Sequence, residues 1–138
     1  MKKAKHSIVI LDDEEATLFA FKEALSDHCL SIDTAQSLDE VKHLLYHKQY
    51  HGAVLDLRLN SGSEAYEGFK AITMVKLHNP QCKIIVLTAY GHPDLKEKAL
   101  RMKADIFLEK PASPENIKNI FKSLGALQCK PEDILASP

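Results

Sequence analysis

Residues 52–56 of the sequence read Gly-Ala-Val-Leu-Asp, a short apolar run that ends in the carboxylate of Asp56. Residues 7–11, Ser-Ile-Val-Ile-Leu, form a similar run, which two aspartates follow at once. Short continuous apolar runs with β-branched side chains are typical of strands that are buried on both faces of a parallel sheet. The two runs therefore predict central strands of such a sheet, each with acidic side chains at its carboxyl end.

Three further segments predict strands. Residues 83–87 and 105–108 are again mostly apolar, whereas residues 30–34 alternate apolar and polar side chains, as a more exposed strand does. Helical periodicity and capping signals fill the intervals between the strands. The predicted helices are one over residues 14–26, one that Ser37 caps with Glu40 three residues on, one around residues 69–77, one that starts at His92 and one that Ser113 caps. This alternation predicts an α/β fold, a doubly wound five-stranded parallel sheet with five helices on its two faces.

Composition narrows the class of protein. The 138 residues fit one ordinary domain, and a net charge of −1 without a basic run does not suggest nucleic-acid binding. The apolar runs are too short to span a membrane. Cys29, Cys82 and Cys129 form no disulfide pattern, so we expect reduced thiols and a cytoplasmic location. Residues 1–125 are expected to form the domain, and residues 126–138 a tail or the start of a linker.

Polar side chains gather where four of the predicted strands end. Asp12 and Asp13 follow the first strand, Asp56 the third, Thr88 the fourth and Lys110 the fifth. Open parallel sheets bind ligands outside the carboxyl ends of their strands, so we expect these side chains to share one site. Neighbouring carboxylates repel one another, and a hard divalent cation such as Mg²⁺ relieves that repulsion. A carboxylate can also accept a phosphoryl group, whose charge a metal ion, a hydroxyl and an ammonium group can stabilise.

Each of these residues also has a simpler explanation. Acids before a helix often serve as N-terminal caps, and an aspartate after a strand is often a turn residue. A threonine after a strand is uninformative, and a Lys-Pro pair can simply end one. The combination at four strand ends is much more specific than any of its members, and it favours Asp56 as a phosphoryl acceptor.

Four segments carry a resemblance to a known family. They are residues 8–14, Ile-Val-Ile-Leu-Asp-Asp-Glu; residues 54–59, Val-Leu-Asp-Leu-Arg-Leu; residues 86–90, Val-Leu-Thr-Ala-Tyr; and residues 107–111, Phe-Leu-Glu-Lys-Pro. In this order they resemble the receiver domain of two-component response regulators, over about residues 7–124. The resemblance implies a flavodoxin-like fold with the strand order 2-1-3-4-5.

The resemblance also implies a role for each acid. Asp56 is expected to be the phosphoacceptor. Asp13, Asp56 and the backbone carbonyl of Arg58 are expected to ligate Mg²⁺ directly, and Asp12 mainly through a bound water. No organic cofactor is expected.

A second set of residues is expected to read the phosphoryl group. By the resemblance, Thr88 turns toward it and Lys110 pairs with it, and the Lys110–Pro111 peptide is cis. Phe107, three residues before Lys110, stands where the family places an aromatic residue that moves inward on activation.

The implied function is that of a phosphorylatable signalling switch. It is not that of an enzyme, beyond self-catalysed phosphorylation and dephosphorylation. The expected phosphoryl donor is a histidine kinase or a histidine phosphotransfer protein. The surface of the fourth helix, fifth strand and fifth helix is expected to regulate an output domain or partner protein. The resemblance also allows a phosphorylation-dependent homodimer, while direct contacts with nucleic acid or a membrane are not expected.

The sequence departs from the family after Asp56. The family usually has a proline a few residues after the acceptor and then a short path to a glycine in the third helix, whereas residues 59–68 contain no proline. If Gly68 is the matching glycine, residues 60–67 form an extended loop beside the site. Glu64 and Glu67 are then expected to be solvated loop acids.

Three alternatives remain open from the sequence. An aspartyl phosphohydrolase of the haloacid-dehalogenase type has an acid two residues after its nucleophile, where this chain has Arg58. A nucleotide- or flavin-binding module lacks support because residues 12–15 contain no glycine. A receiver used mainly for docking is compatible with every motif.

His43, His47 and His51 have a spacing that can bind zinc, but no third ligand is evident, and a solvated helix face is the preferred interpretation.

Overall fold

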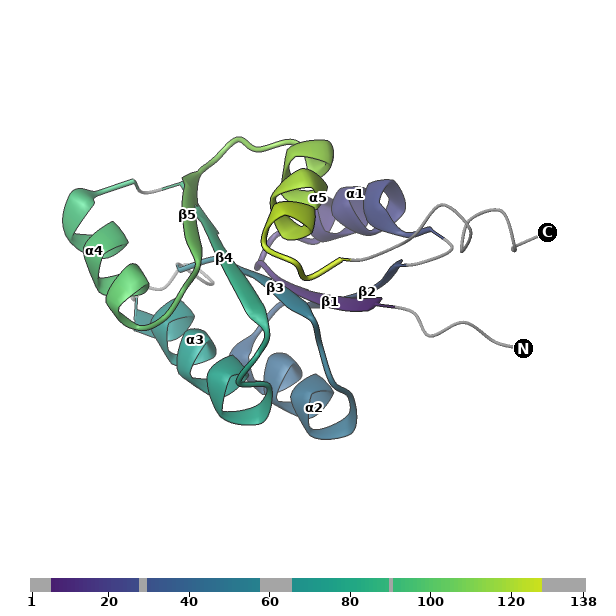
Figure 1. The fold of residues 1–138 in the computed structure, drawn as a ribbon, viewed down its shortest axis with the longest axis horizontal. Coiled ribbons are helices and arrows are strands. Elements are labelled where there is room, and N and C mark those ends of the chain that lie inside the picture. Colours follow the sequence, from purple (N-terminus) through teal and green to yellow (C-terminus); the bar gives the residue numbers. More distant parts are fainter. Residues whose placement is uncertain (1–5, 28–29, 58–65, 90, 128–138) are drawn as a thin grey trace.

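The computed structural model describes residues 6–27, 30–57, 66–89 and 91–127. The elements are, in chain order, β1 (His6–Leu11), α1 (Glu15–Leu25), β2 (Leu30–Ala35), α2 (Leu38–His47), β3 (Gly52–Leu55), α3 (Tyr66–His78), β4 (Lys83–Thr88), α4 (Pro93–Arg101), β5 (Ile106–Glu109) and α5 (Pro114–Ser123). The strands form one sheet of parallel pairs in the order β2-β1-β3-β4-β5 (Figure 1). This confirms the predicted fold class and strand order.

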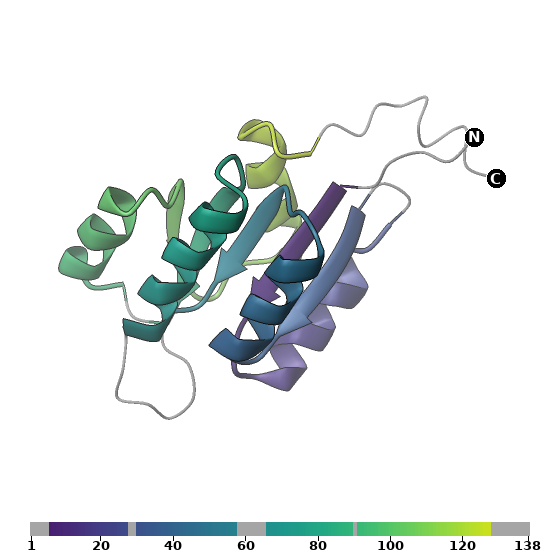
Figure 2. The same cartoon turned by 90° about the horizontal axis from the view of Figure 1, so that it is seen from below.

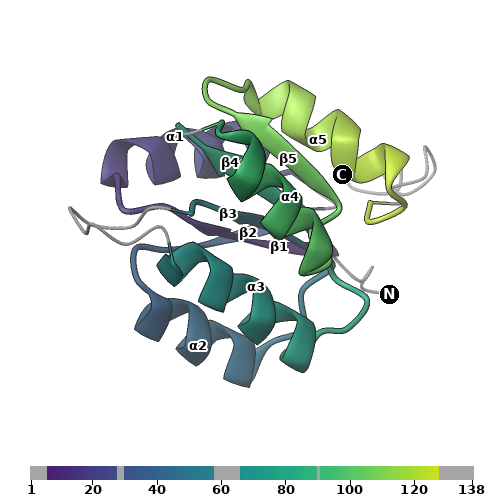
Figure 3. The same ribbon diagram turned by 90° about the vertical axis from the view of Figure 1, so that its left-hand side faces the viewer.

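The helices form two layers, one on each face of the sheet. α1 and α5 lie on one face, and α2, α3 and α4 lie toward the other (Figure 3). Figure 2 shows the molecule from below, with the blue α2 and the teal α3 in front of the sheet. Each layer closes over its own buried core, because successive residues of a strand point to opposite faces. In β1, for example, Ile8 and Ile10 face the α1 and α5 side, whereas Val9 and Leu11 face the other side.

Two serine caps fix where α2 and α5 begin. The Ser37 hydroxyl accepts a hydrogen bond from the backbone N–H of Glu40 at 3.2 Å, and the Ser113 hydroxyl accepts one from that of Asn116 at 3.1 Å. Both caps confirm the predicted helix starts. The Glu40 carboxylate reaches back to the N–H of Gln36 at 2.8 Å, one residue before the cap itself.

Three details differ from the sequence prediction. α3 begins at Tyr66, inside the segment that was predicted to be a loop, because the first turn of a helix tolerates polar residues such as Glu67. β5 ends at Glu109, one residue later than predicted, because its pairing with β4 continues to Thr88. The helix predicted over residues 14–26 is shorter, because α1 runs from Glu15 to Leu25 and buries Leu18, Phe21 and Leu25.

α4 makes a small contact with the core. Ala99 is the buried residue of this helix, and Leu100 is 40% exposed. Among the described residues, none of the helices combines the length and apolar character that a membrane span requires.

Candidate functional site

The carboxyl ends of β1, β3, β4 and β5 meet at one edge of the sheet. The register pairs Leu11 with Leu55 and Leu55 with Val86, so the acids that follow β1 and β3 emerge side by side. The N–H of Asp56 donates to the carbonyl of Leu11 at 3.0 Å, which extends the ladder one step beyond β3. We call Asp12, Asp13, Asp56, Thr88 and Lys110 together the carboxyl-edge site.

Three carboxylates converge in this site. Asp12, Asp13 and Asp56 each offer an oxygen, and these oxygens lie within 4.8 Å of one another. Asp12 and Asp56 are buried, with exposed fractions of 3% and 6%, whereas Asp13 is exposed. Such a set of hard oxygen donors, open to solvent on one side, fits a divalent cation that keeps part of its water shell.

Lys110 is the basic partner of these acids. Its ammonium group donates to Asp12 Oδ2 at 2.7 Å and to Asp56 Oδ2 at 3.1 Å. Burial by itself lowers the pKa of Lys110, but its hydrogen bond to Asp12 and the charges of Asp56 and Asp12 outweigh it, so the pKa is raised above its usual value. The Lys110–Pro111 peptide is cis, as predicted. Lys110 therefore stays protonated between two buried carboxylates.

Both carboxylate oxygens of Asp12 accept hydrogen bonds. Its Oδ1 accepts the backbone N–H of Glu14 at 2.9 Å, and its Oδ2 accepts from Lys110. The N–H of Glu14 precedes α1 and is one of the donors that a helix start leaves without an internal partner. Sequence reasoning assigned an acid-favouring position to this turn but did not predict the contact between Glu14 and Asp12.

The end of β4 is tied to the lysine. Thr88 is fully buried, and its carbonyl accepts the backbone N–H of Lys110 at 2.8 Å. Phe107 is half-buried and packs against the core on the α2, α3 and α4 side. Thr88 and Lys110 thus lie at the same edge of the sheet. Their roles toward a phosphoryl group stay predictions.

Gly68 connects α3 to the carboxyl edge. Its N–H donates to the carbonyl of Leu57 at 3.1 Å. A Cβ at this position would clash with Leu57 Cα and would lie 2.5 Å from the carbonyl oxygen of Asp56. Only glycine fits here without moving backbone next to Asp56. The backbone of α3 at Gly68 therefore lies directly against the backbone of Asp56 and Leu57.

A second glycine contact was missed by sequence reasoning. Gly91 precedes α4, and a Cβ there would overlap the carboxylate of Glu109 at the end of β5. The two residues are 18 positions apart in the sequence, and Gly91 lies outside the four segments that carry the resemblance. No local signal therefore pointed to this contact.

Some predicted features lie elsewhere. Arg58, whose carbonyl was predicted to bind metal, and the loop residue Glu64 lie outside the described residues. The His43 and His47 rings are 4.5 Å apart, and the described residues place no third metal ligand beside them. His51 lies at the other end of the sheet, where its ring accepts the N–H of Ser7 at 3.0 Å.

Curated relatives match most of the chain. The photosynthetic apparatus regulatory protein RegA of Cereibacter sphaeroides is 29% identical over 135 residues, which are 97% of this chain and 71% of RegA. The acid tolerance regulatory protein ActR of Rhizobium meliloti is 30% identical over 111 residues, 80% of this chain and 55% of ActR. The alginate biosynthesis transcriptional regulatory protein AlgB of Pseudomonas aeruginosa is 29% identical over 80% of this chain, which spans 24% of AlgB.

Solved structures share the fold. A response regulator from Burkholderia pseudomallei, crystallised with a phosphorylated aspartic acid, calcium ion and citrate, is 25% identical with a TM-score of 0.75. The match covers 97% of this chain and 76% of that one. A CheY-like receiver domain protein from Methanospirillum hungatei is 23% identical with a TM-score of 0.77, covering 88% of this chain and 95% of that one. The model of the response regulator receiver domain matches residues 8–122, so this chain belongs to the receiver domain family of response regulators.

Proposed function

We propose that Asp56 accepts a phosphoryl group from a phosphohistidine of a histidine kinase or phosphotransfer protein, and that this event switches the protein between two signalling states. The observation that carries the proposal is the surroundings of Asp56. This buried carboxylate follows the end of β3. Asp13 belongs to the same cluster of acids, and the ammonium group of Lys110 donates a hydrogen bond to Asp56. Relatives named as regulatory proteins, and a related structure with a phosphorylated aspartic acid, support it.

The proposed reaction is a phosphoryl transfer between two nucleophiles. A carboxylate oxygen of Asp56 forms the new P–O bond as the P–N bond of the phosphohistidine breaks, and the electron pair of that bond returns to the imidazole nitrogen. The imidazole then takes a proton from solvent. Lys110 can leave the Asp56 carboxylate and pair with the added phosphoryl oxygens, because its single charge sits on a flexible stem.

The acids would hold a divalent cation, which we propose to be Mg²⁺. Receiver domains bind a divalent metal at an acidic site, and the related Burkholderia structure contains calcium. Asp13 and Asp56 would ligate the ion directly, and Asp12 through water, since both oxygens of Asp12 are engaged by Glu14 and Lys110. When bound, the cation would neutralise charge on the transferred group. Arg58 would add its backbone carbonyl.

The switch itself would pass through the end of β4. In the proposal the hydroxyl of Thr88 bonds a phosphoryl oxygen, and the half-buried Phe107 moves further into the space that this motion leaves. Phosphorylation then shifts a pre-existing equilibrium between two surfaces of α4, β5 and α5. An output domain or partner protein reads that surface. We place these events in the cytoplasm, and we propose no catalytic turnover beyond self-phosphorylation and dephosphorylation.

The test uses a small phosphodonor. Incubation of the full chain with acetyl phosphate and Mg²⁺ should add one hydroxylamine-sensitive phosphoryl group, detected by intact-mass spectrometry. Asp56→Asn should abolish the addition and Thr88→Ala should leave it in place, because Thr88 is assigned to the response. Unchanged labelling of the Asp56→Asn protein would overturn the assignment. Steady release of phosphate from a phosphomonoester would instead support a phosphohydrolase.

A further inference from the structure

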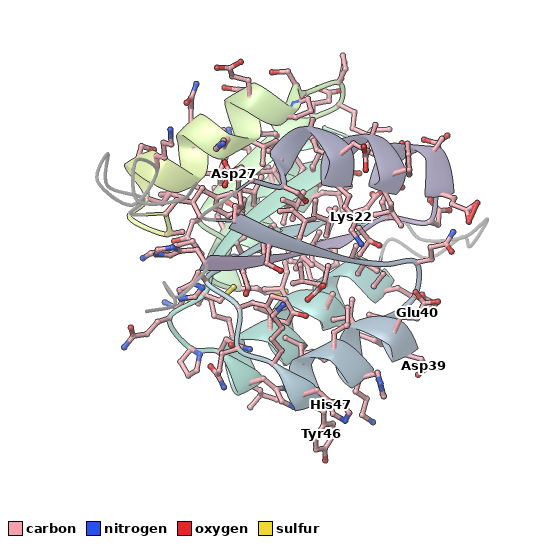
Figure 4. All side chains as sticks on the ribbon, turned by 90° about the vertical axis from the view of Figure 1, so that its right-hand side faces the viewer. Lys22, Asp27, Asp39, Glu40, Tyr46 and His47 are labelled. Carbon is pink, nitrogen blue, oxygen red and sulfur yellow. The ribbon has the colours of Figure 1, made fainter. Side chains whose placement is uncertain are left out.

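A polar cavity lies at the amino edge of the sheet, opposite the carboxyl-edge site. It has a volume of about 850 Å³ and is bounded by the start of β1, the segment before β3, the segment between α3 and β4, and the residues after α5. Figure 4 views the molecule from the right-hand side of Figure 1. We call it the amino-edge pocket, and its polar lining includes His6, His51, Lys76, Asn79 and Lys83.

The charge of this lining has one sign. His6, His51, Lys76 and Lys83 are basic or can become so, and none of the described residues that line the pocket is an aspartate or a glutamate. Asp105, which lies near the pocket, uses its Oδ2 to accept the N–H of Ile84 at 2.8 Å. A concave surface that carries cationic side chains, and no carboxylate among its described lining residues, attracts anions.

One residue of the pocket lining, Asn79, carries a buried donor without a hydrogen-bond partner among the described residues. Asn79 is 3% exposed, and its Oδ1 accepts the backbone N–H of Tyr50 at 2.8 Å. That bond fixes which end of the amide is which, so the other end is the Nδ2 group. Nδ2 is buried and has no hydrogen-bond partner among the described residues. A buried donor without a partner costs free energy, which an acceptor entering from the pocket can offset.

The walls around this donor are firmly held. The carbonyl of His51 accepts the N–H of Lys83 at 3.0 Å, and its own N–H donates to the carbonyl of Ser7 at 2.8 Å. The His51 ring accepts the N–H of Ser7 through Nδ1 at 3.0 Å, so in the neutral ring the proton is on Nε2. The ring lies 4.7 Å from that of His6. Lys76 is held by the carbonyl of Cys82 at 2.9 Å. These bonds hold the backbone of His51 and Lys83, the His51 ring and the Lys76 side chain in place.

We propose that the amino-edge pocket binds a small, multiply charged oxyanion, a metabolite that carries phosphate or carboxylate groups. Lys83 and the His51 ring supply charge and a donor at the wall, and Asn79 Nδ2 supplies the buried donor. The cavity volume lies within the range of small-molecule sites. This inference goes beyond the proposed function and does not depend on phosphorylation of Asp56.

The test is a titration of the full chain with inorganic pyrophosphate in metal-free buffer at physiological ionic strength, followed by NMR of backbone amides. Saturable shifts should centre on Ser7, Tyr50, His51 and Lys83. A parallel titration with succinate distinguishes the two classes of ligand. Tighter binding of pyrophosphate identifies a ligand with phosphate groups, and tighter binding of succinate identifies one with carboxylate groups. Absence of saturable shifts in both titrations, or shifts confined to the carboxyl-edge site, would overturn the proposal.

Two variants and one control locate the binding groups. Lys83→Met should weaken binding about threefold to fivefold, the loss expected for one partly exposed ion pair. Asn79→Asp keeps the acceptor for Tyr50 but replaces the unused donor by an oxygen, and should weaken binding about tenfold or more. The exposed Lys96 on α4 gives the matched control Lys96→Met, which should bind as the natural chain does. If Asn79→Asp does not fold, unchanged binding by Lys83→Met still refutes the proposal.

The outcome can be separated from that of the proposed function. Lys83→Met should accept a phosphoryl group on Asp56 at the natural rate, and Asp56→Asn should bind pyrophosphate at the amino edge with unchanged affinity. Loss of both activities in either variant would indicate misfolding, which the amide spectrum detects directly.

Discussion

The two edges of the same sheet carry opposite charges and hold them differently. At the carboxyl edge, Asp12 and Asp56 are buried and share the ammonium group of Lys110. At the amino edge, His51 and Lys83 stand in an open pocket without a carboxylate among the described lining residues. Charges at the first edge therefore depend strongly on one another, whereas those at the second are screened by solvent.

The helix directions explain this separation. Each helix that follows a parallel strand runs back across the sheet, so its positive N-terminal end lies at the carboxyl edge and its negative C-terminal end at the amino edge. Asp39 and Glu40 accordingly occupy the first turn of α2, and His47 its last turn (Figure 4). The same dipoles that favour a phosphoryl group beside Asp56 oppose an anion at the amino edge. We therefore expect the amino-edge pocket to be the weaker anion site.

The largest difference between the edges should come from removing one lysine at each. Lys110→Met leaves two buried carboxylates without their cation and should lower the free energy of unfolding by about 3 kcal/mol, near the lower limit for breaking a buried ion pair. Lys83→Met should change it by less than about 0.5 kcal/mol. Urea unfolding in metal-free buffer measures both. Mg²⁺ should restore part of the stability of Lys110→Met, and equal losses in the two variants would contradict the comparison.

Two glycines extend the comparison to the backbone. Gly68→Ala forces a Cβ against Leu57, which should lower the free energy of unfolding by about 3 kcal/mol. The higher helix propensity of alanine should offset about 1 kcal/mol of this loss. Gly125, beside the amino-edge pocket, has a φ of +82° but open space around its Cβ position. Gly125→Ala should therefore cost about 1 kcal/mol through backbone strain alone. Unfolding midpoints in urea compare them, and a neutral Gly68→Ala would show that the close approach can relax.

A third prediction concerns the hydrogen bond between Tyr50 and Asp33. The Tyr50 hydroxyl donates to Asp33 Oδ2 at 2.7 Å, and Lys48 donates to the same oxygen at 3.0 Å. Tyr50→Phe should lower the free energy of unfolding by about 1 kcal/mol at neutral pH. The control Tyr46→Phe changes a side chain that is 73% exposed and should be neutral.

The loss in Tyr50→Phe should depend on pH. Burial raises the pKa of Asp33, but the hydrogen bonds from Tyr50 and Lys48 outweigh it and hold the pKa below the ordinary 3.8. A carboxyl whose pKa is depressed by folding contributes stability above its unfolded pKa and loses it as the pH falls through the folded value. The gap between the natural chain and Tyr50→Phe should therefore be constant above about pH 5 and narrow below 3.8. A gap that widens in acid would refute this assignment.

The smallest effect concerns the His51 ring. Burial and the charge of the nearby His6 lower the pKa of His51 from 6.5. Neutral His51 therefore contributes stability that is present above 6.5 and is lost as the pH falls through the folded pKa. His6→Gln removes the second cause and should raise the pKa of His51, which an NMR titration of the ring protons measures. Bound pyrophosphate should raise it in the natural chain as well, and a downward shift in either case would count against a cationic pocket.

Most of the fold could be predicted from the sequence because its signals are local. The continuous apolar runs of β1, β3 and β4 reflect burial on both faces, and the serine caps mark where α2 and α5 begin. The boundary of α3 was less certain, since polar first turns and polar loops have the same composition. The domain boundary at residue 125 stays a prediction, although Ala126 and Leu127 are buried against the core.

The site was predictable in its members but not in its contacts. The acids and the lysine stand at strand ends, where the topology brings them together. Which atoms pair depends on distances between segments far apart in the chain, as for Lys110 and Asp12. The amino-edge pocket left no signal because Asn79 and Lys83, at the start of β4, are far in the sequence from His51, which precedes β3. Its buried amide donor can be recognised only when every neighbour of Asn79 has been located.

The hydrogen bond between Gly68 and Leu57 has a consequence for how such a protein can change. The bond fastens Leu57, the residue after Asp56, to Gly68 in the first turn of α3, at the two sides of the segment 58–67 of the sequence. Doubling the length of a closed loop costs only about 0.6 kcal/mol of chain entropy. Insertions can therefore accumulate in this segment without displacing Asp56. Recognition of partners can diversify there while the chemistry of the phosphoryl group stays the same.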